Sequence, residues 1–240
     1  MSLLLITLSG LMAAAWFLSQ EDSPLFRPIQ QYKLTSANEH VTAKEIDRVM
    51  QSYLGLSFWE VDLEAIQSEL IRLDWASSAR VKRSWPDQLY VQIEEQTPAA
   101  RWGESALVNQ RGVVFYPTDL KGFDNLVVLE GQLSESANIL MALSEYQAVL
   151  SPIKFIISRI QQKPDGVWVI STLKGSSIVL DKTQPVAKLK SFVAAYAKLS
   201  KALRKSPQVY DLRYSNGFII GKIKSLILPM PNAADNAFEK

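Results

Sequence analysis

The sequence of 240 residues contains no cysteine and a single histidine, His40. Without cysteine the chain has neither disulfides nor thiolate metal sites. His40 stands beside a predicted helix start, without the spacing of metal ligands around it, so we interpret it as a solvated residue and not as a ligand or a catalytic base. Together these counts exclude thiolate metal sites and most catalytic triads.

The chain also lacks a strong net charge. Lys and Arg together number 26 and Asp and Glu 24, and the formal net charge of +2 gives no support for a nucleic-acid partner. The densest basic cluster is Arg80, Lys82 and Arg83, but alternation along a strand directs Lys82 away from Arg83, and no glycine-rich loop accompanies them. We therefore predict that the protein binds no nucleic acid.

The residues of an active site are missing as well. Glu94 and Glu95 are adjacent on a predicted strand, so their side chains point to opposite faces; we expect one to be solvated and the other to pair with an arginine. No Gly-x-Ser-x-Gly elbow occurs. The sequence predicts no enzyme, no catalytic residues, no cofactor, no metal and no small-molecule substrate. A secreted enzyme with an unrecognised site stays an alternative, which a deep pocket with converging titratable groups would support.

One long apolar run stands at the start of the chain. Ser2 to Ser19 contains no charged residue and as a helix would span about 27 Å at ~1.5 Å per residue, close to the thickness of a bilayer core. It is a membrane anchor or a signal peptide. Cleavage after Ala13 to Ala15 would leave Trp16 bare near the mature terminus, and no basic segment precedes the run, so we favour an anchor with its amino terminus in the cytoplasm.

Residues 29–97 carry the patterns of a small α+β domain. Ile29 to Leu34 is a predicted strand, and Thr42 with Glu45 forms a capping box at the start of a helix that Gly55 ends. A second helix is predicted over 62–73. The predicted apolar stripes are Ile46, Val49, Met50 and Tyr53 on the first helix and Leu63, Ile66, Leu70 and Leu73 on the second.

A hairpin follows these helices. Leu89, Val91 and Ile93 alternate with polar residues, the period of a half-buried strand. Before them, proline in the turn Trp85 to Gln88 predicts a type I turn. The order strand, helix, helix, hairpin therefore predicts two helices packed on a three-stranded sheet.

The hairpin and its surroundings resemble the POTRA domain and following segment of the FtsQ (DivIB) family of bacterial cell-division proteins. The resemblance extends to about Lys222 and implies a POTRA domain followed by a second, family-specific β domain. It rests on Leu73, Trp75, Val81, Arg83, Trp85, Pro86, Asp87, Leu89, Glu95, Pro98, Ala100, Arg101 and Trp102, and farther on Leu107, Val108, Asn109, Gly112, Phe115, Asp211, Leu212, Arg213 and Tyr214.

From Trp102 the pattern changes to short strands with turn signals between them. Strands joined so tightly predict an antiparallel meander, with helices over 134–150 and from Pro185 to about Leu203. The predicted fold is α+β: a transmembrane helix, a small POTRA domain, and a larger domain with an antiparallel sheet and two helices. The predicted segments are an anchor over 1–20, a linker over 21–28, the POTRA domain over 29–97, the β domain over 98–224 and a disordered tail over 225–240.

A second hairpin is predicted at the end of the folded part of the chain, with strands over 208–214 and 218–222. Asn216-Gly217 favours a type I′ turn between them. A last strand at a sheet edge can accept a strand from another chain, whereas Lys222 and Lys224 are charges that proteins place on edges to prevent pairing, so both readings stay open.

The resemblance implies that this hairpin receives FtsB by strand addition. Family members often carry tryptophan where Lys222 stands here. A second contact is predicted at Arg83, Trp85 and Asp87; the alternative is that these residues fix a turn and its packing. The predicted partner-binding residues of the hairpin are Arg213, Tyr214, Asn216, Gly217, Phe218, Ile219, Ile220, Gly221 and Lys222.

By the same resemblance, the protein is expected to be a non-enzymatic scaffold of the divisome. It would sit as a single-pass protein in the cell inner membrane at the septum, with its carboxyl-terminal domain in the periplasm. There it would bind FtsB, FtsL and other division proteins and help control septal peptidoglycan synthesis. The alternative is a POTRA-containing component of outer-membrane assembly or secretion, but such proteins usually carry tandem POTRA units.

Overall fold

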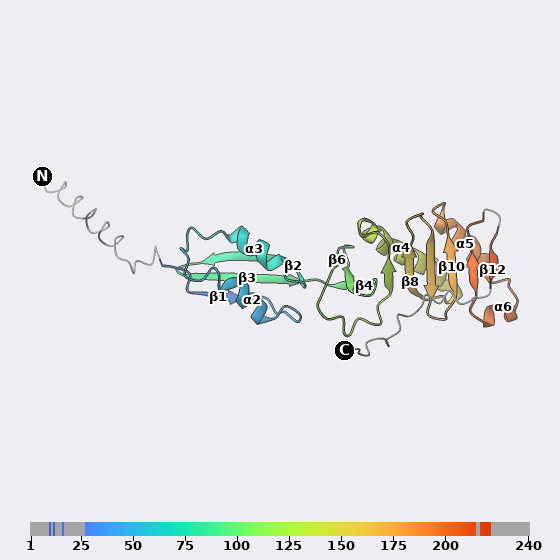
Figure 1. Ribbon diagram of the computed structural model, residues 1–240, viewed down its shortest axis with the longest axis horizontal. Coiled ribbons are helices and arrows are strands. Elements are labelled where there is room, and N and C mark those ends of the chain that lie inside the picture. Colours follow the sequence, from blue (N-terminus) through green and yellow to red (C-terminus); the bar gives the residue numbers. More distant parts are fainter. Residues whose placement is uncertain (1–9, 11, 13–15, 17–26, 215–216, 222–240) are drawn as a thin grey trace, which may run out of the picture. The chain divides into compact units, whose positions relative to one another are not determined.

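The computed structural model describes residues 27–214 and 217–221 and, before them, residues 10, 12 and 16 (Figure 1). The chain forms two compact units that divide between residues 97 and 98, and residues 115–118 group with the first. Helices and sheets occur in both units, so the predicted α+β class is confirmed. Most of the predicted anchor and all of the predicted tail lie outside the described residues. Within the described part, no helix is long and apolar enough to cross a membrane.

Over residues 27–97 the first unit is a three-stranded sheet with two helices, as predicted. β1 (Gln31–Leu34) pairs in parallel with β3 (Gln88–Glu95), which pairs antiparallel with β2 (Ala76–Ser84). Part of each predicted apolar stripe on α2 (Ala43–Met50) and α3 (Leu63–Ile71) is buried against this sheet, and the rest is half-buried. The first helix ends at Met50, before the predicted Gly55, so Tyr53 of its predicted stripe lies in the turns that follow. The buried cluster includes Ile46 and Met50 of α2, Ile66 and Leu70 of α3, and Leu89, Val91 and Ile93 of β3.

The ends of the elements in this unit follow from their side chains. The capping box of α2 is present, since Thr42 Oγ1 accepts the Glu45 N–H at 3.3 Å and the Glu45 carboxylate accepts the Thr42 N–H at 2.8 Å. The Trp85–Pro86 peptide in the turn between β2 and β3 is cis. The sequence did not distinguish the isomers because their free energies differ little at X–Pro bonds.

The second unit contains one sheet of nine strands in the order β12-β11-β10-β9-β8-β7-β4-β5-β6. Its elements are β4 (Pro98–Trp102), β5 (Ala106–Asn109), β6 (Val114–Phe115), β7 (Val128–Glu130), α4 (Ser136–Leu150), β8 (Ile157–Gln162), β9 (Trp168–Thr172), β10 (Ser177–Leu180), α5 (Pro185–Tyr196), α6 (Lys201–Lys205), β11 (Val209–Asp211) and β12 (Ile219–Gly221), with short 3-10 helices at Leu133–Glu135 and Ser151–Ile153.

The sheet is mixed, and the prediction of an antiparallel sheet is wrong at three pairings. β4 with β7, β7 with β8, and β10 with β11 run in parallel. For the last two of these pairs the cause is visible in the order of elements, because α4 connects β7 to β8 and α5 with α6 connects β10 to β11. A helix returns the chain to the end of the sheet where the previous strand began, so the next strand runs in the same direction.

The number of helices also differs from the prediction, since the described residues of this unit form three α-helices and not two. The helix predicted from Pro185 to about Leu203 ends at Tyr196, and α6 begins after Ser200, whose Oγ accepts the Leu203 N–H at 3.5 Å. Apolar periodicity continues across this break, and for that reason the sequence predicted one helix.

In the core of the second unit, α5 packs on one face of the sheet, against β11. α4 and α5 pack against each other, and α4 packs on β7 and β8 (Figure 1). Phe192 of α5 is buried, and its ring centroid lies 4.9 Å from that of Tyr210 in β11. The position of β11, and of β12 beside it, is therefore fixed from one face by aromatic packing.

Candidate partner-binding edge

β12 is the last strand of the nine-stranded sheet. It pairs antiparallel with β11, with Val209 opposite Gly221, Tyr210 opposite Ile220 and Asp211 opposite Ile219. No second strand pairs with β12 among residues 27–214 and 217–221. An edge strand presents backbone N–H and C=O groups that can bind a further strand. Asn216 and Lys222, which belong to the predicted site, lie outside the described residues.

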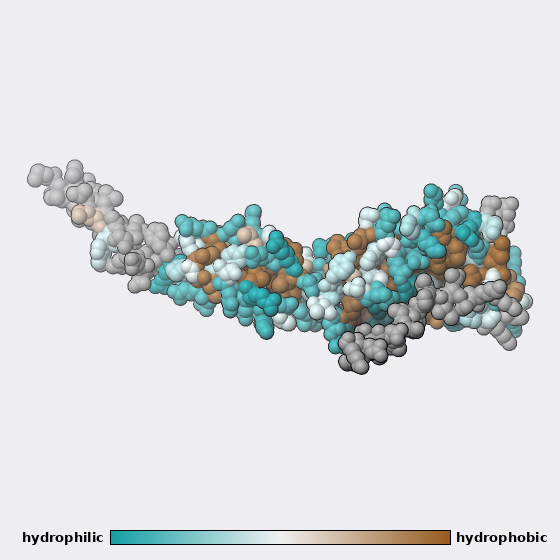
Figure 2. All heavy atoms as spheres, viewed as in Figure 1, coloured by the Kyte–Doolittle hydropathy of each residue, from teal (hydrophilic) through white to brown (hydrophobic). Residues whose placement is uncertain are grey.

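Side chains of this edge divide between the core and the surface. Phe218 is half-buried, and its ring centroid lies 5.1 Å from that of Phe192 in an edge-on contact. Ile220 is also half-buried against the core, whereas Ile219 is 54% exposed. Hydrophobic residues interrupt the hydrophilic surface of this unit (Figure 2). The core thus holds the strand in place while one apolar side chain stays accessible.

A groove of about 930 Å³ lies between α5, the loop before it and the segment that leads from β11 to β12. On its wall, Lys188 Nζ donates to Asp181 Oδ2 at 2.7 Å and to the Arg213 carbonyl at 3.2 Å. The hydrogen bond from Lys188 lowers the pKa of Asp181. A general acid needs a raised pKa, so Asp181 is not suited to that role. The lining residues are Asp181, Thr183, Gln184, Ala187, Lys188, Ser191, Phe192, Ala195, Leu212, Arg213, Tyr214, Gly217 and Phe218.

Arg213 and Tyr214 stand where the groove meets the edge strand. The Arg213 guanidinium binds the Asp211 carboxylate through contacts of 2.6, 2.9 and 3.1 Å, and this pairing lowers the pKa of Asp211. The side chain of Arg213 is 51% exposed and Tyr214 is 54% exposed. A fixed, half-exposed guanidinium beside an exposed phenol ring can select among partner side chains.

The second predicted contact separates into two kinds of residue. Arg83 Nε donates to the Phe58 carbonyl at 2.7 Å, and its Nη2 donates to the carbonyls of Trp59 and Val61 at 3.1 and 2.7 Å, so these donors are used within the domain. Asp87 is buried, and its carbonyl accepts the Gln30 N–H at 2.9 Å. Trp85, in contrast, is 62% exposed.

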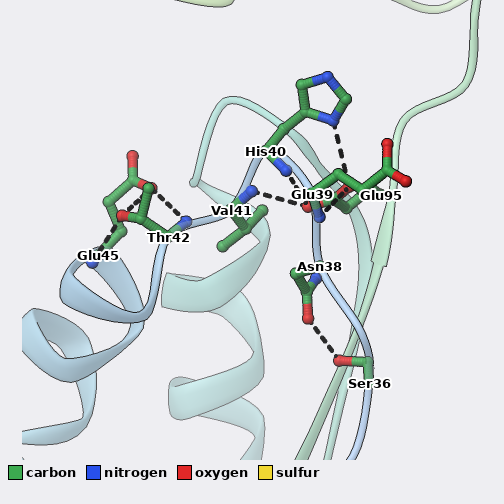
Figure 3. Close-up of polar contacts among 8 residues, drawn as sticks. All are labelled: Ser36, Asn38, Glu39, His40, Val41, Thr42, Glu45 and Glu95. Atoms are coloured by element: carbon green, nitrogen blue, oxygen red, sulfur yellow. Dashed lines mark hydrogen bonds and ion pairs between the residues drawn. The ribbon is translucent and has the colours of Figure 1, made fainter.

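We expected one of the two adjacent glutamates to pair with an arginine, but Glu95 binds backbone N–H groups instead. Its carboxylate accepts the backbone N–H groups of Glu39, His40 and Val41 at 3.2, 2.9 and 2.7 Å (Figure 3). Burial raises the pKa of Glu95, but these hydrogen bonds outweigh it and the pKa lies below its ordinary value. His40 is half-buried, and its ring stacks on Trp75 with 3.8 Å between centroids. The interpretation of His40 as a solvated residue is therefore wrong.

Each of the two units matches a model of a known protein family. The family model of the FtsQ-type POTRA domain matches residues 27–96, and the model of the carboxyl-terminal domain of cell division protein FtsQ/DivIB matches residues 100–213. The chain belongs to the FtsQ/DivIB family. The second matched range ends at Arg213, so Tyr214 and β12 lie beyond it.

Several FtsQ proteins are similar to this chain over most of its length. The FtsQ of Allochromatium vinosum is 31% identical over 219 residues, which cover 91% of this chain and 86% of the relative. The FtsQ of Coxiella burnetii is 28% identical over 198 residues and 82% of each chain. The FtsQ of Xanthomonas campestris pv. campestris is 29% identical over 194 residues, 80% of this chain and 69% of the relative.

Proposed function

We propose that this member of the FtsQ/DivIB family is a non-enzymatic scaffold of the bacterial division machinery at the septum. Residues 1–20 would anchor it in the cytoplasmic membrane, with the POTRA domain and the β domain in the periplasm. The uncharged run from Ser2 to Ser19 supports the anchor, and family membership supports the role in division. Through its partners the protein would help control septal peptidoglycan synthesis.

The mechanism we propose is strand addition by FtsB, in company with FtsL, along residues 218–222. The observation that carries it is the position of β12 at the edge of the sheet, with β11 as its neighbour in the described chain. Backbone hydrogen bonds would supply affinity that depends little on sequence. Ile219, Arg213 and Tyr214, all about half exposed, would supply specificity through an apolar and a charged contact.

Substitution of the exposed edge residue tests this mechanism. Ile219→Glu should weaken FtsB binding about tenfold or more, because a charge replaces an apolar contact at the added strand and such contacts contribute more than ~1 kcal/mol. Leu173→Glu is the matched control, since Leu173 is 68% exposed on the same unit and lies in the turn between β9 and β10. Affinity is measured by titration of the membrane-reconstituted full chain with FtsB.

Removal of the edge gives a second measurement. A chain that ends at Asn216 lacks β12 and should no longer co-purify with FtsB, while its thermal unfolding should remain cooperative. Retained binding by this truncated chain, or an unchanged affinity of Ile219→Glu, would eliminate strand addition at β12.

A further inference from the structure

Three segments of the first unit meet at one end of its sheet, where the described chain enters. The Ile29 N–H donates to the Leu56 carbonyl at 2.9 Å, and Pro28 forms an antiparallel bridge with Ser57. The Gln30 N–H donates to a carbonyl of the turn between β2 and β3. The Arg83 guanidinium binds three carbonyls in the loop before α3. We call this surface, made of residues 27–30, 55–61 and 84–88, the entry end.

The entry end exposes large apolar side chains. Trp59 is 55% exposed, Trp85 is 62% exposed and Leu56 is 46% exposed. Their neighbour Phe58 is buried, and its ring supports Trp59 edge-on with 5.1 Å between centroids. Side chains of this size and kind are usually covered, and several together at one end of a domain mark a binding surface. Rigid backbone contacts fix the two tryptophans at the same end.

The chain itself brings this end close to the uncharged run. Residues 20–26 separate Ser19 from Arg27. A fully extended segment of seven residues spans at most about 25 Å at ~3.6 Å per residue. If Ser2 to Ser19 spans the bilayer, the entry end is the part of the first unit that is tied closest to the membrane surface.

We propose that the entry end binds the membrane interface, with Trp59, Trp85 and Leu56 inserted among the lipid headgroups. The amphipathic indole ring of tryptophan favours this region of a bilayer. Glu60 and Asp62 are exposed beside Trp59, and Arg27 lies 4.0 Å from Asp87, so the surface offers no excess of positive charge within its described residues. Recognition therefore rests on the aromatic rings and needs no anionic lipid. The proposal goes beyond partner binding and depends on the membrane anchor proposed above.

Absence of cysteine from the natural sequence allows a direct test on the full chain. A single cysteine is introduced at the exposed entry-end residue, Glu60→Cys, or at Ala37→Cys, in the loop beside Glu39, whose N–H binds Glu95 at the opposite end of β3. Each chain is labelled with an environment-sensitive fluorophore and reconstituted in phosphatidylcholine vesicles that carry a headgroup-region nitroxide lipid. We expect greater quenching at position 60 than at position 37.

The aromatic side chains are then tested in the same assay. Trp59→Ser combined with Trp85→Ser should reduce the quenching at position 60, because the anchor alone would hold this end near the membrane without inserting it. Ile71→Ser, which removes an exposed side chain at the end of α3, should leave it unchanged. Thermal unfolding of each variant confirms that the domain remains folded.

The outcomes separate this inference from the anchor on which it depends. Vesicle flotation of the chain with equal quenching at the two positions would overturn the membrane contact alone. A requirement for added phosphatidylglycerol would overturn its aromatic basis. Failure of the chain to float with vesicles would overturn the anchor and the membrane contact together.

Discussion

Glu95 joins the end of β3 to a loop that lies 54 to 56 positions earlier in the chain. Its carboxylate accepts three successive backbone N–H groups, and His40 Nδ1 lies 3.3 Å from one oxygen. Replacement by glutamine removes the negative charge and one acceptor oxygen. Glu95→Gln should lower the free energy of unfolding by about 1.5–3 kcal/mol, the range of hydrogen bonds to charged groups.

Glu94→Gln is the matched control, because Glu94 is the exposed neighbour on the opposite face of β3 and should change stability by no more than about 0.5 kcal/mol. The effect of Glu95 also depends on pH. Since its folded pKa lies below the ordinary value of 4.5, its stabilisation is fully present above pH 4.5 and is lost as pH falls through the folded pKa. Urea unfolding at several pH values should therefore show the difference between parent and Glu95→Gln shrink below pH 4.5.

At the scale of elements, β12 depends on the aromatic side chain behind it. Phe192 is almost fully buried and contacts both Tyr210 of β11 and Phe218 beside β12. Phe192→Ala should lower the free energy of unfolding by about 3–5 kcal/mol, because it leaves a cavity in the core. It should also speed hydrogen exchange of amides 218–221 more than that of β8 and β9.

Met141→Ala provides the control on α4, where the side chain is 63% exposed and a loss of stability is not expected. Equal acceleration of exchange in β8, β9 and β12 by Phe192→Ala would contradict the specific support of β12. Such a result would mean that Phe192 stabilises the unit as a whole.

The elements differ in how far the sequence predicted them. The capping box at Thr42 and the alternation from Leu89 to Ile93 act over a few residues, and both predictions are confirmed. The direction of β8 and β11 depends on the helices that precede them, which make each strand parallel to its partner. The tight turns elsewhere in the domain suggested antiparallel pairing throughout, which is wrong for these two strands. Glu95 illustrates the same limit, because the backbone groups that it binds come from a distant loop.

The site was predicted unevenly for related reasons. The strand around Ile219 could be placed from its residue pattern, and the structure puts it at a sheet edge. The groove beside it could not, because α5, the loop before it and Arg213 meet there only through the parallel crossover between β10 and β11. The exposure of Trp85 was likewise not predicted, because its motif indicated only a turn.

At the scale of the whole molecule, the two proposed contacts belong to separate cores. The entry end is built on the cluster that contains Phe58, and β12 is built on the cluster that contains Phe192. Substitutions without shared neighbours usually add within about 0.5 kcal/mol, roughly a factor of two in an equilibrium constant. Trp59→Ser with Trp85→Ser should therefore leave FtsB affinity within about twofold of the parent.

The reverse also follows, and it provides the stricter test. Ile219→Glu should weaken FtsB binding about tenfold or more without changing lipid quenching at position 60. The chain that carries all three substitutions should show both losses to the same extent as the separate variants. A change in lipid quenching caused by Ile219→Glu would mean that the two units are energetically coupled. The membrane contact and the partner contact would then have to be treated as one linked equilibrium, because coupling between two sites acts equally in both directions.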